Sequence, residues 1–420
     1  MRISGLLLAA VFAVGATTAL AQTVAVGTCK PSLVSFPTIQ QAVNASPSGV
    51  TIVVCPGTYP EQVVIGNNLT LKGTAVGNSG ASIITPPAGG LVQNTASLAT
   101  GNPIAAQILV KAPASSVTIT DLTIDGANNG ISDCSLNPIG VYYQNASGSL
   151  SHNSVLNQAL TPSLNGCQSG LGIFVQSGGG GVSTVSVVSN HVANYQKNGI
   201  TGNEVGTHVT VTSNTVIGQG STTGAAENSI QIGFGATGTI TKNTVGSDVW
   251  APDTISDPGD AAAGLLVFGS AGVTITSNVV SDTQFGIAVV SDAFDALPAD
   301  GAVVSKNTVS ETHIFDGIDL CSNNNSATMN LVNGSDEAGI HVDPTCTGAA
   351  TGNTVTKNTI NSACAGIMSG VGASGNTTAP NTFYNAATLQ LTGTDVCTPP
   401  LAGTRKTVTK ARARFHPARP

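Results

Sequence analysis

The sequence has little charge and few aromatic residues. Charged residues make up 8% of its 420 residues, aromatic residues make up 4%, and no arginine lies between Arg2 and Arg405. A chain this poor in Lys, Glu and Leu does not favour helices, whereas its abundant Val, Thr and Ile favour strands. The low charge does not indicate disorder, because 41% of the residues are hydrophobic.

Long apolar runs are also missing, apart from one short run at the start. Arg2, the apolar stretch from Leu6 to Val14 and the small residues before Gln22 have the form of a secretory signal peptide that is cleaved after Ala21. The apolar stretch is too short to span a bilayer as a stable helix. We therefore expect residues 1–21 to be removed and the protein to be secreted or periplasmic, with no membrane partner.

Several motifs of common enzymes and binding proteins are absent. The chain has no Cys-x-x-Cys pair, no Gly-x-Ser-x-Gly, no His-Glu-x-x-His and no phosphate-binding glycine loop. A chain with a net charge of -7 and few aromatic residues does not suit nucleic acid as a partner. These absences argue against redox, serine hydrolase, metalloprotease, nucleotide-binding and nucleic-acid-binding classes.

The sequence does contain a repeat built from two phrases. One is a β-rich run followed by Asn and then Thr or Val, and it occurs at Asn190, Asn214, Asn243, Asn278, Asn307 and Asn358. The other is a small residue, often Gly, followed by an apolar–x–apolar strand, and it occurs at Ile173, Ile230, Leu265, Ile287, Ile318 and Ile340. The second phrase recurs about every 28 residues, which is typical of a β-solenoid whose loops vary in length.

The repeat predicts an all-β fold, a single right-handed parallel β-helix of about ten or more rungs over residues 22–400. Alternate residues of each strand point inward, and stacked rungs share one core. We interpret the recurring Asn as structural, because Asn tolerates a left-handed backbone at a corner and stacked Asn side chains bond along the axis.

Both ends of the solenoid need a cover, because an open rung exposes strand edges. A short helix that begins at Thr38, with Ile39, Ala42 and Val43 on one face, is expected to lie over the first rung. At the other end, residues 401–420 contain six basic residues and no acidic residue. They are expected to form a disordered basic tail.

The eight cysteines fit an oxidising compartment. In a solenoid each residue meets only its own rung and the neighbouring rungs, so pairs adjacent in the sequence are favoured. The predicted disulfides are Cys29–Cys55, Cys134–Cys167, Cys321–Cys346 and Cys364–Cys397. The alternative is that some of these cysteines are free thiols.

A resemblance supports the same fold. The segment FPTIQQAVNASPSGVTIVVCPGTYPEQVVIGNNLTLKG, from Phe36 to Gly73, resembles the opening of pectinesterases and related proteins of the pectin-lyase-like superfamily. The later Asn-Thr-Val rungs resemble the parallel β-helix repeat of that superfamily. The resemblance implies this fold and a role with polysaccharides, but the catalytic motifs of pectinesterases, polygalacturonases and pectate lyases are absent, so those activities are not expected.

The carboxylates are unevenly distributed. Fourteen of the 21 lie between Asp248 and Asp343, where Lys306 is the one basic residue. Such a field repels anionic polysaccharides unless Ca²⁺ intervenes, and it suits neutral glycans or cations. Calcium in loops with Asp-x-x-x-Asp spacing is one option, and no other cofactor is expected. The alternative is that these residues lie in solvated loops that keep the protein soluble.

The repeat places acidic and histidine side chains on one outer face. With Ile318 pointing inward, Asp319 points outward and stacks on His341 of the next rung, while Asp343 lies diagonally and Asp316 precedes the strand. We predict that these two or more carboxylates and the histidine act as acid, base or binding groups. The alternative is a surface Asp–His pair beside a disulfide.

Four further residues are candidates for binding. Leu266 and Phe268 point outward from a preceding rung, and an apolar strip beside acidic residues could hold a sugar ring or be covered by a loop. Glu311 and His313 lie in the turn that leads to the acidic strand.

Two functions are therefore open from the sequence. The first is a secreted protein that binds or processes polysaccharide or cell-surface glycan, and the second is a non-catalytic structural or surface-binding β-helix. A third option is a metal-delivery accessory similar to the copper-linked periplasmic β-helix proteins, for which three methionines give little support. We expect a monomer.

Overall fold

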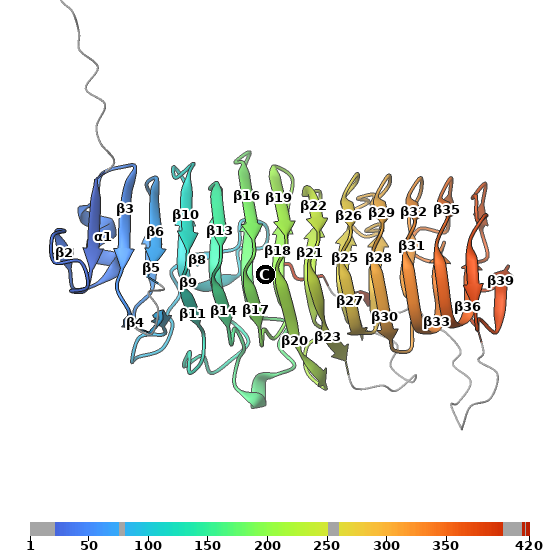
Figure 1. Cartoon of the computed structure of the whole chain (residues 1–420), viewed down its shortest axis with the longest axis horizontal. Helices are drawn as coiled ribbons and strands as arrows, with labels where there is room; N and C mark the ends of the chain where they lie inside the picture. Colours follow the sequence, from blue (N-terminus) through green and yellow to red (C-terminus); the bar gives the residue numbers. More distant parts are fainter. Residues whose placement is uncertain (1–21, 75–79, 251–259, 398–413, 416) are drawn as a thin grey trace, which may run out of the picture.

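The chain winds into an elongated right-handed parallel β-helix, which runs in Figure 1 from α1 at one end to β39 at the other. This computed structural model describes residues 22–74, 80–250, 260–397, 414–415 and 417–420. The expected signal peptide lies outside the described residues. Among the residues that are described, no helix is long and apolar enough to span a membrane.

Each rung contributes strands to three faces. The first face is a 13-stranded sheet with the order β2 (Ser35–Phe36), β1 (Thr23–Val26), β3 (Val50–Val54), β6 (Leu69–Gly73), β10 (Val117–Thr120), β13 (Gly148–Ser151), β16 (Ser183–Val188), β19 (Thr207–Thr212), β22 (Thr237–Thr241), β26 (Thr274–Thr276), β29 (Val303–Ser305), β32 (Ser326–Thr328) and β35 (Thr354–Thr356).

The other two faces share a 23-stranded sheet. The second face stacks β4 (Gly57–Pro60), β7 (Ser82–Thr85), β11 (Thr123–Asp125), β14 (Ser154–Leu156), β17 (His191–Ala193), β20 (Thr215–Thr222), β23 (Thr244–Trp250), β27 (Val279–Thr283), β30 (Thr308–Thr312), the first parts of β33 (Leu331–Val342) and β36 (Thr359–Ser369), and β38 (Thr382–Tyr384).

The third face carries the candidate sites. It stacks β5 (Val63–Ile65), β9 (Pro103–Lys111), β12 (Asn137–Gln144), β15 (Leu171–Gln176), β18 (Asn198–Asn203), β21 (Asn228–Gly233), β25 (Ala263–Phe268), β28 (Phe285–Val290), β31 (Ile318–Cys321), the second parts of β33 and β36, and β39 (Thr388–Thr392). The remaining short strands are β8 (Thr95–Ala96), β24 (Asp260–Ala261), β34 (Ala350–Thr351), β37 (Ala373–Ser374) and β40 (Arg414–Phe415), and the short helices are α1 (Ile39–Ala45) and a 3-10 turn (Pro162–Leu164).

The core is a column of aliphatic side chains inside the coil. On the third face the register places Ile173 over Ile200, then Ile230, Leu265, Ile287, Ile318, Ile340 and Ile367, and all of these are buried. Burying such side chains is worth roughly 1.5–3 kcal/mol each relative to exposure. The predicted inward apolar positions are therefore confirmed.

The small residue that precedes these strands has a steric cause. A Cβ atom on Gly286 would lie 2.3 Å from Val309 Cγ1 and 2.4 Å from the carbonyl oxygen of Gly317, so no larger residue fits there without a shift. The same crowding occurs at Gly264, Gly317 and Gly339. Ser229 stands at this position in β21 and departs from the pattern.

The recurring Asn residues form a buried ladder along the axis. The Nδ2 of Asn190 donates to Oδ1 of Asn214 at 3.0 Å, and Asn214 donates in the same way to Asn243 at 3.0 Å. The bond repeats through Asn278, Asn307, Asn330, Asn358 and Asn381. The structural interpretation is confirmed, but from Asn190 to Asn358 the left-handed backbone belongs to the residue before each Asn, such as Ser213 with φ 57°.

The cap and the disulfides agree with the predictions from the sequence. Helix α1 begins after Thr38, whose side chain accepts a hydrogen bond from the Gln41 amide at 3.1 Å, and it buries Ile39, Ala42 and Val43. The four disulfides are Cys29–Cys55, Cys134–Cys167, Cys321–Cys346 and Cys364–Cys397, and no cysteine is free. The expected tail, residues 401–420, lies mainly outside the described residues, but residues 414–415 and 417–420 are described.

Candidate functional site

One row of outward-pointing side chains on the third face changes its chemistry along the solenoid. Paired from rung to rung, this outer row is Tyr142, Phe174, Thr201, Gln231, Leu266, Ala288, Asp319, His341, Met368 and Leu391. It passes from aromatic to polar and uncharged, then to apolar, then to ionisable at Asp319 and His341, and it ends in apolar residues. Two groups of polar side chains on this face are candidate sites.

The first group is the carboxylate–histidine cluster, made of Asp316, Asp319, His341, Asp343 and Asp395. The register of β31 and β33 pairs Asp319 with His341, as predicted. Asp316 Oδ2 lies 3.1 Å from His341 Nδ1, and Asp316 Oδ1 accepts a hydrogen bond from the Ala338 amide at 3.0 Å. The side chains of Asp316 and His341 are 0% exposed, so this Asp–His pair is buried.

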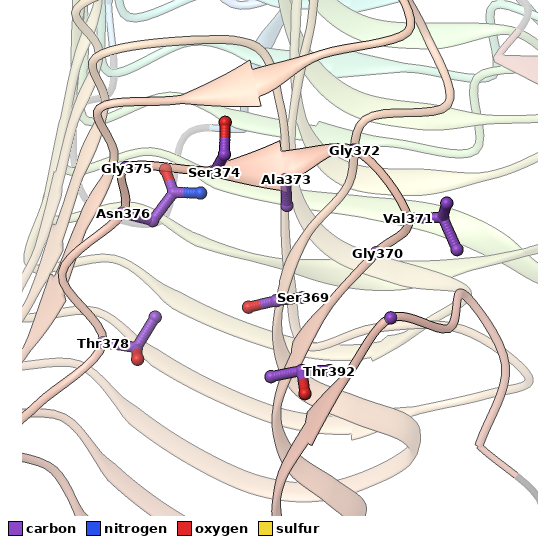
Figure 2. A pocket seen from close by; sticks show the side chains of 11 residues that line it. Ser369, Gly370, Val371, Gly372, Ala373, Ser374, Gly375, Asn376, Thr378 and Thr392 are labelled. Carbon is purple, nitrogen blue, oxygen red and sulfur yellow. The ribbon is translucent and has the colours of Figure 1, made fainter.

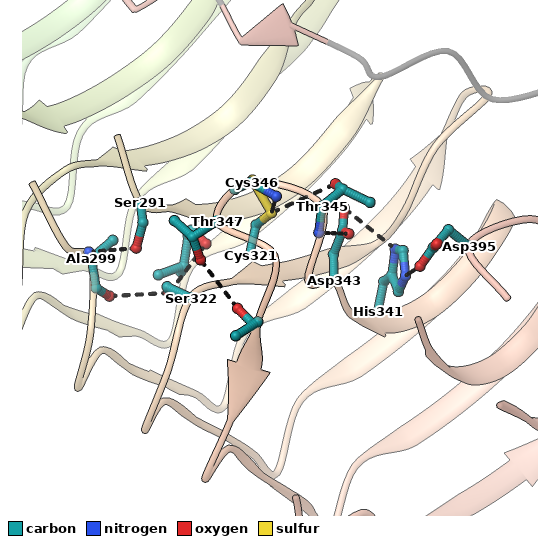
Figure 3. The surroundings of a disulfide bond; sticks show 12 residues. Ser291, Ala299, Cys321, Ser322, His341, Asp343, Thr345, Cys346, Thr347 and Asp395 are labelled. Atoms are coloured by element: carbon teal, nitrogen blue, oxygen red, sulfur yellow. Dashed lines mark hydrogen bonds and ion pairs between the residues drawn. A yellow bond between two sulfur atoms is a disulfide. The ribbon is translucent and has the colours of Figure 1, made fainter. Parts of the chain in front are cut away.

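Two more carboxylates flank the imidazole. His341 Nδ1 lies 4.0 Å from Asp343 Oδ2, and His341 Nε2 lies 3.8 Å from Asp395 Oδ1. Figure 3 shows the imidazole between these two carboxylates, next to the Cys321–Cys346 disulfide. Sequence reasoning missed Asp395, because it follows the last rung and no repeat phrase fixes its position.

The structure places the other predicted binding residues apart from this cluster. Leu266 is buried in an apolar group with Ala288, and the ring of Phe268 lies 5.5 Å from the ring of Phe234. His313 pairs with Asp282 at 2.9 Å between Nε2 and Oδ1, where both side chains are more than 40% exposed. Glu311 is exposed and has a left-handed backbone with φ 54°.

The second group is the amide patch, made of Asn198, Thr201, Asn203, Asn228 and Gln231 on β18 and β21. Its members bond to one another: Asn198 Nδ2 donates to Thr201 Oγ1 at 3.0 Å and to Gln231 Oε1 at 2.9 Å. Asn228 donates to Asn198 at 3.0 Å, and Gln231 donates to Asn203 at 2.9 Å. None of these side chains carries a charge. All five are buried, including Thr201 and Gln231, which belong to the outer row.

Residues 417–420 cover part of the amide patch. The Ala418 amide donates to Gln231 Oε1 at 2.8 Å, and its carbonyl accepts from Asn203 Nδ2 at 2.7 Å and from Gln231 Nε2 at 2.9 Å. Ala418 also packs in an apolar group with Tyr142 and Phe174, whose rings stack at 4.8 Å. In Figure 1 the end of the chain accordingly lies near β18, in the middle of the solenoid.

A third group lies inside the coil and was not predicted from the sequence. The interior carboxyl pair consists of Glu227 and Asp248, and Tyr195 and Ser229 bond to Asp248. Burial raises the pKa of Asp248 to about 8, against the opposing effect of these hydroxyl donors. Burial, followed by the charge of Asp248, raises the pKa of Glu227. Ser229 in place of the usual Gly is the signal that marks this rung.

A pocket lies at the far end of the solenoid. Ser369, Ser374, Asn376, Thr378 and Thr392 contribute polar groups to its lining (Figure 2). The other lining residues are small or apolar, and none of the lining residues carries a charge. It therefore offers hydrogen bonds but no acid, base or ion-binding group.

Comparison with known proteins assigns a family. The model of the family described as periplasmic copper-binding protein (NosD) matches residues 183–398. The chain belongs to the NosD family. The match covers the amide patch, the interior carboxyl pair and the carboxylate–histidine cluster. No curated protein sequence matches the chain. The family and the four disulfides indicate a location outside the cytoplasm.

Solved structures share the fold of this NosD-family chain. The Dettilon tailspike protein is 15% identical with a TM-score of 0.56, over 80% of this chain and 62% of the tailspike chain. The A-module of the Azotobacter vinelandii mannuronan C-5 epimerase AlgE4 is 10% identical with a TM-score of 0.51, over 88% of this chain and 94% of that module. These similarities confirm the right-handed parallel β-helix and show the fold alone. The closer resemblance of the opening to pectinesterases stays a prediction.

The family description implies copper, so the donor atoms need a test. One ligand atom each from Asp316, Asp319 and His341 lies within 4.8 Å of the others, and the same holds for His341, Asp343 and Asp395. Each set has one imidazole, two carboxylates and no sulfur. Imidazole and carboxylate fit a divalent ion such as Cu²⁺, whereas Cu⁺ prefers thiolate and thioether ligands. The cluster therefore fits Cu²⁺ and not Cu⁺.

Proposed function

We propose that this protein is an exported β-helix that binds an uncharged or cationic glycan chain along its third face, at the amide patch. The observation that carries this proposal is the patch itself, a set of uncharged amide and hydroxyl side chains on the outer side of a sheet. An amide offers both donors and acceptors in one plane, which matches the hydroxyl groups of a sugar. The stacked rings of Tyr142 and Phe174 continue the same row.

The surrounding charge supports the choice of glycan. Glu204 follows β18 directly, and Asp295 comes from the loop after β28 to meet the same bound segment. Because carboxylates repel other anions, these residues disfavour acidic polysaccharides at the patch. The third face contributes no described lysine or arginine beside the patch other than the buried Lys197. The charges around the amide patch therefore favour neutral and cationic glycans as ligands.

Binding is better supported than turnover. Asp316, Asp319, His341 and Asp343 were the residues expected to act as acid and base, and a general acid or base must reach the reacting atoms. Asp316 and His341 are fully buried and bond to each other. The amide patch contains no group that titrates near neutral pH. A panel of neutral, acidic and amino-sugar polysaccharides should therefore be bound without sugar release, and release that Asp319→Asn abolishes would refute this preference.

The binding site can be tested with a nearly isosteric substitution. Thr201→Val removes one hydroxyl from the amide patch and keeps the shape of the side chain, so it should weaken glycan binding by about 1 kcal/mol, or roughly fivefold. Thr210→Val, on β19 of the first face, is the matched control and should bind as wild type does. Calorimetry with the tightest glycan of the panel measures both. Equal affinities for all three proteins would overturn the site.

A second candidate function is divalent metal binding at the carboxylate–histidine cluster. The position of one imidazole among four carboxylates favours it, together with the family description. When bound, Cu²⁺ would be held by His341 with Asp316 and Asp319, or by His341 with Asp343 and Asp395. The protein's own contribution is to exclude water from these ligands and to orient the imidazole through Asp316.

Metal binding has a direct readout. Titration of the protein with Cu²⁺ and with Zn²⁺, followed by calorimetry, should show one site whose affinity falls at least about tenfold in His341→Gln. His313→Gln is the matched control, because His313 also pairs with an aspartate but lies outside the cluster. Equal affinity in the two variants would exclude the cluster as the metal site.

A further inference from the structure

Residues 417–420 occupy the amide patch in the way that a ligand would. The main chain of Ala418 uses its amide and its carbonyl to bond to Gln231 and Asn203, and the residue is 2% exposed. At Pro420 the carbonyl oxygen accepts from Thr100 Oγ1 at 2.7 Å. The contacts therefore extend from the patch to a loop near the β8 strand.

The neighbouring residue, Arg419, occupies a site for a cation. Its Nε lies 3.0 Å from Glu204 Oε1 and its Nη2 lies 3.2 Å from Glu204 Oε2, so the contact is bidentate. A third nitrogen, Nη1, donates to Asp295 Oδ2. The guanidinium carbon lies 4.3 Å from the centre of the Phe234 ring. Two carboxylates and an aromatic face form the same combination that proteins use to hold a cationic ligand group.

The parts of this cation site come from segments far apart in the sequence. Glu204 follows β18, Phe234 follows β21, and Asp295 lies in the loop between β28 and β29. Phe234 also holds a left-handed backbone with φ 57°, which is unfavourable for a bulky residue and which places its ring under the guanidinium. The site is thus built by the fold and does not follow from the sequence of residues 417–420.

We propose that residues 417–420 are an intramolecular competitor for the glycan site, and that the cation site that holds Arg419 selects a glycan with a cationic amino group. This inference rests on the proposed glycan function and specifies its ligand and its regulation. When the segment leaves, the amide patch gains solvent-facing donors and acceptors, and Glu204 and Asp295 become an acidic pair beside the Phe234 ring. A protonated amino sugar supplies hydroxyl groups for the amide patch and an ammonium group for the acidic pair.

The test uses two matched hexamers, one of β-1,4-linked glucosamine and one of N-acetylglucosamine, at a mildly acidic pH at which the amino groups are protonated. In the full chain, Arg419→Ala removes the cation but leaves the main-chain contacts of Ala418. This variant should bind the glucosamine hexamer on the order of tenfold more tightly than wild type. The N-acetylated hexamer should gain less. Lys72→Ala, an exposed lysine on the first face, is the control for loss of one positive charge.

A second variant and a second measurement make the result decisive. Adding Glu204→Gln to Arg419→Ala should weaken binding of the glucosamine hexamer and leave binding of the N-acetylated hexamer unchanged. Hydrogen exchange of the Ala418 and Arg419 amides should be faster in Arg419→Ala, and faster in wild type when the glucosamine hexamer is bound. Unchanged thermal midpoints show that the variants are folded.

The possible outcomes separate the two proposals. If neither hexamer binds to any variant, the glycan function fails for amino sugars and the inference fails with it. If the hexamers bind equally to wild type and Arg419→Ala while Ala418 exchanges faster in the variant, the glycan function stands and the competition is refuted. If both hexamers gain equally from Arg419→Ala, the selection of a cationic group is refuted.

Discussion

Two groups of buried carboxylates lie in the same solenoid and are neutralised in different ways. The interior carboxyl pair, Glu227 and Asp248, has hydroxyl groups around it, and burial raises the pKa of both carboxyls. The carboxylate–histidine cluster lies on the outer side of the sheet and has an imidazole among its acids. The comparison shows that inside the coil burial favours protonated carboxyls even though the charge of Lys197 opposes this at Glu227, whereas the outer cluster places an imidazole among its acids.

The largest effect should come from the pH dependence of the interior pair. Burial raises the pKa of Asp248 from its ordinary value of 3.8 to about 8 in the folded protein. The folded protein therefore binds this proton more tightly than the unfolded chain does. The resulting stabilisation is fully present below the unfolded pKa and is lost as the pH rises through the folded pKa. In that window wild type should lose up to about 1.4 kcal/mol of unfolding free energy per pH unit relative to Asp248→Asn. Urea unfolding between about pH 5 and pH 8 measures this difference. Parallel profiles for the two proteins would contradict it.

The next effect concerns the outer cluster. Asp316→Ala removes the acceptor of the Ala338 amide and the carboxylate that pairs with His341 inside the protein. It should lower the unfolding free energy by about 3 kcal/mol, because the Ala338 amide loses its acceptor and the buried His341 keeps only its longer contacts to Asp343 and Asp395. Asp282→Asn is the control, since the pair of Asp282 with His313 is more than 40% exposed and Asn tolerates the left-handed backbone of this position, so it should cost less than about 1 kcal/mol. Similar losses in both variants would show that burial does not distinguish the pairs.

The smallest effect tests the exceptional serine of the repeat. Ser229→Ala removes the hydroxyl that donates to Asp248, at a cost of about 1 kcal/mol. Because that donor lowers the pKa of Asp248, its loss should raise this pKa further. The loss of stability with rising pH should then end at a higher pH than in wild type. Ser186→Ala, on the first face, is the control and should change the unfolding free energy by less than about 0.5 kcal/mol. An unchanged pH profile in Ser229→Ala would separate Ser229 from Asp248.

The repeat determined which parts of the molecule could be predicted. The Asn ladder, the four disulfides and the pairing of Asp319 with His341 all follow from a constant step between rungs, because a residue then meets only its neighbours one rung away. The helical cap was predictable from Thr38 and the apolar spacing after it. These features are local or periodic.

The missed features are neither local nor periodic. Asp395 and Ala418 reach the third face from segments that follow the last rungs, so no spacing relates them to their partners. Asp248 belongs to a stretch whose many acids favoured solvated loops, yet it is fully buried and pairs with Gly220 of β20 after a register shift between Ile217 and Gly220. Burial at such a corner depends on the packing of three rungs, which a sequence pattern does not specify.

The most direct test of the account is hydrogen exchange of the full chain with and without the bound glucosamine hexamer. We predict slower exchange in β18 and β21, which carry the amide patch, together with faster exchange at Ala418. The strands β31 and β33 of the carboxylate–histidine cluster should not change. Bound hexamer that protects β31 and β33, and leaves β18, β21 and Ala418 as they were, would contradict the assignment of the glycan site to the amide patch.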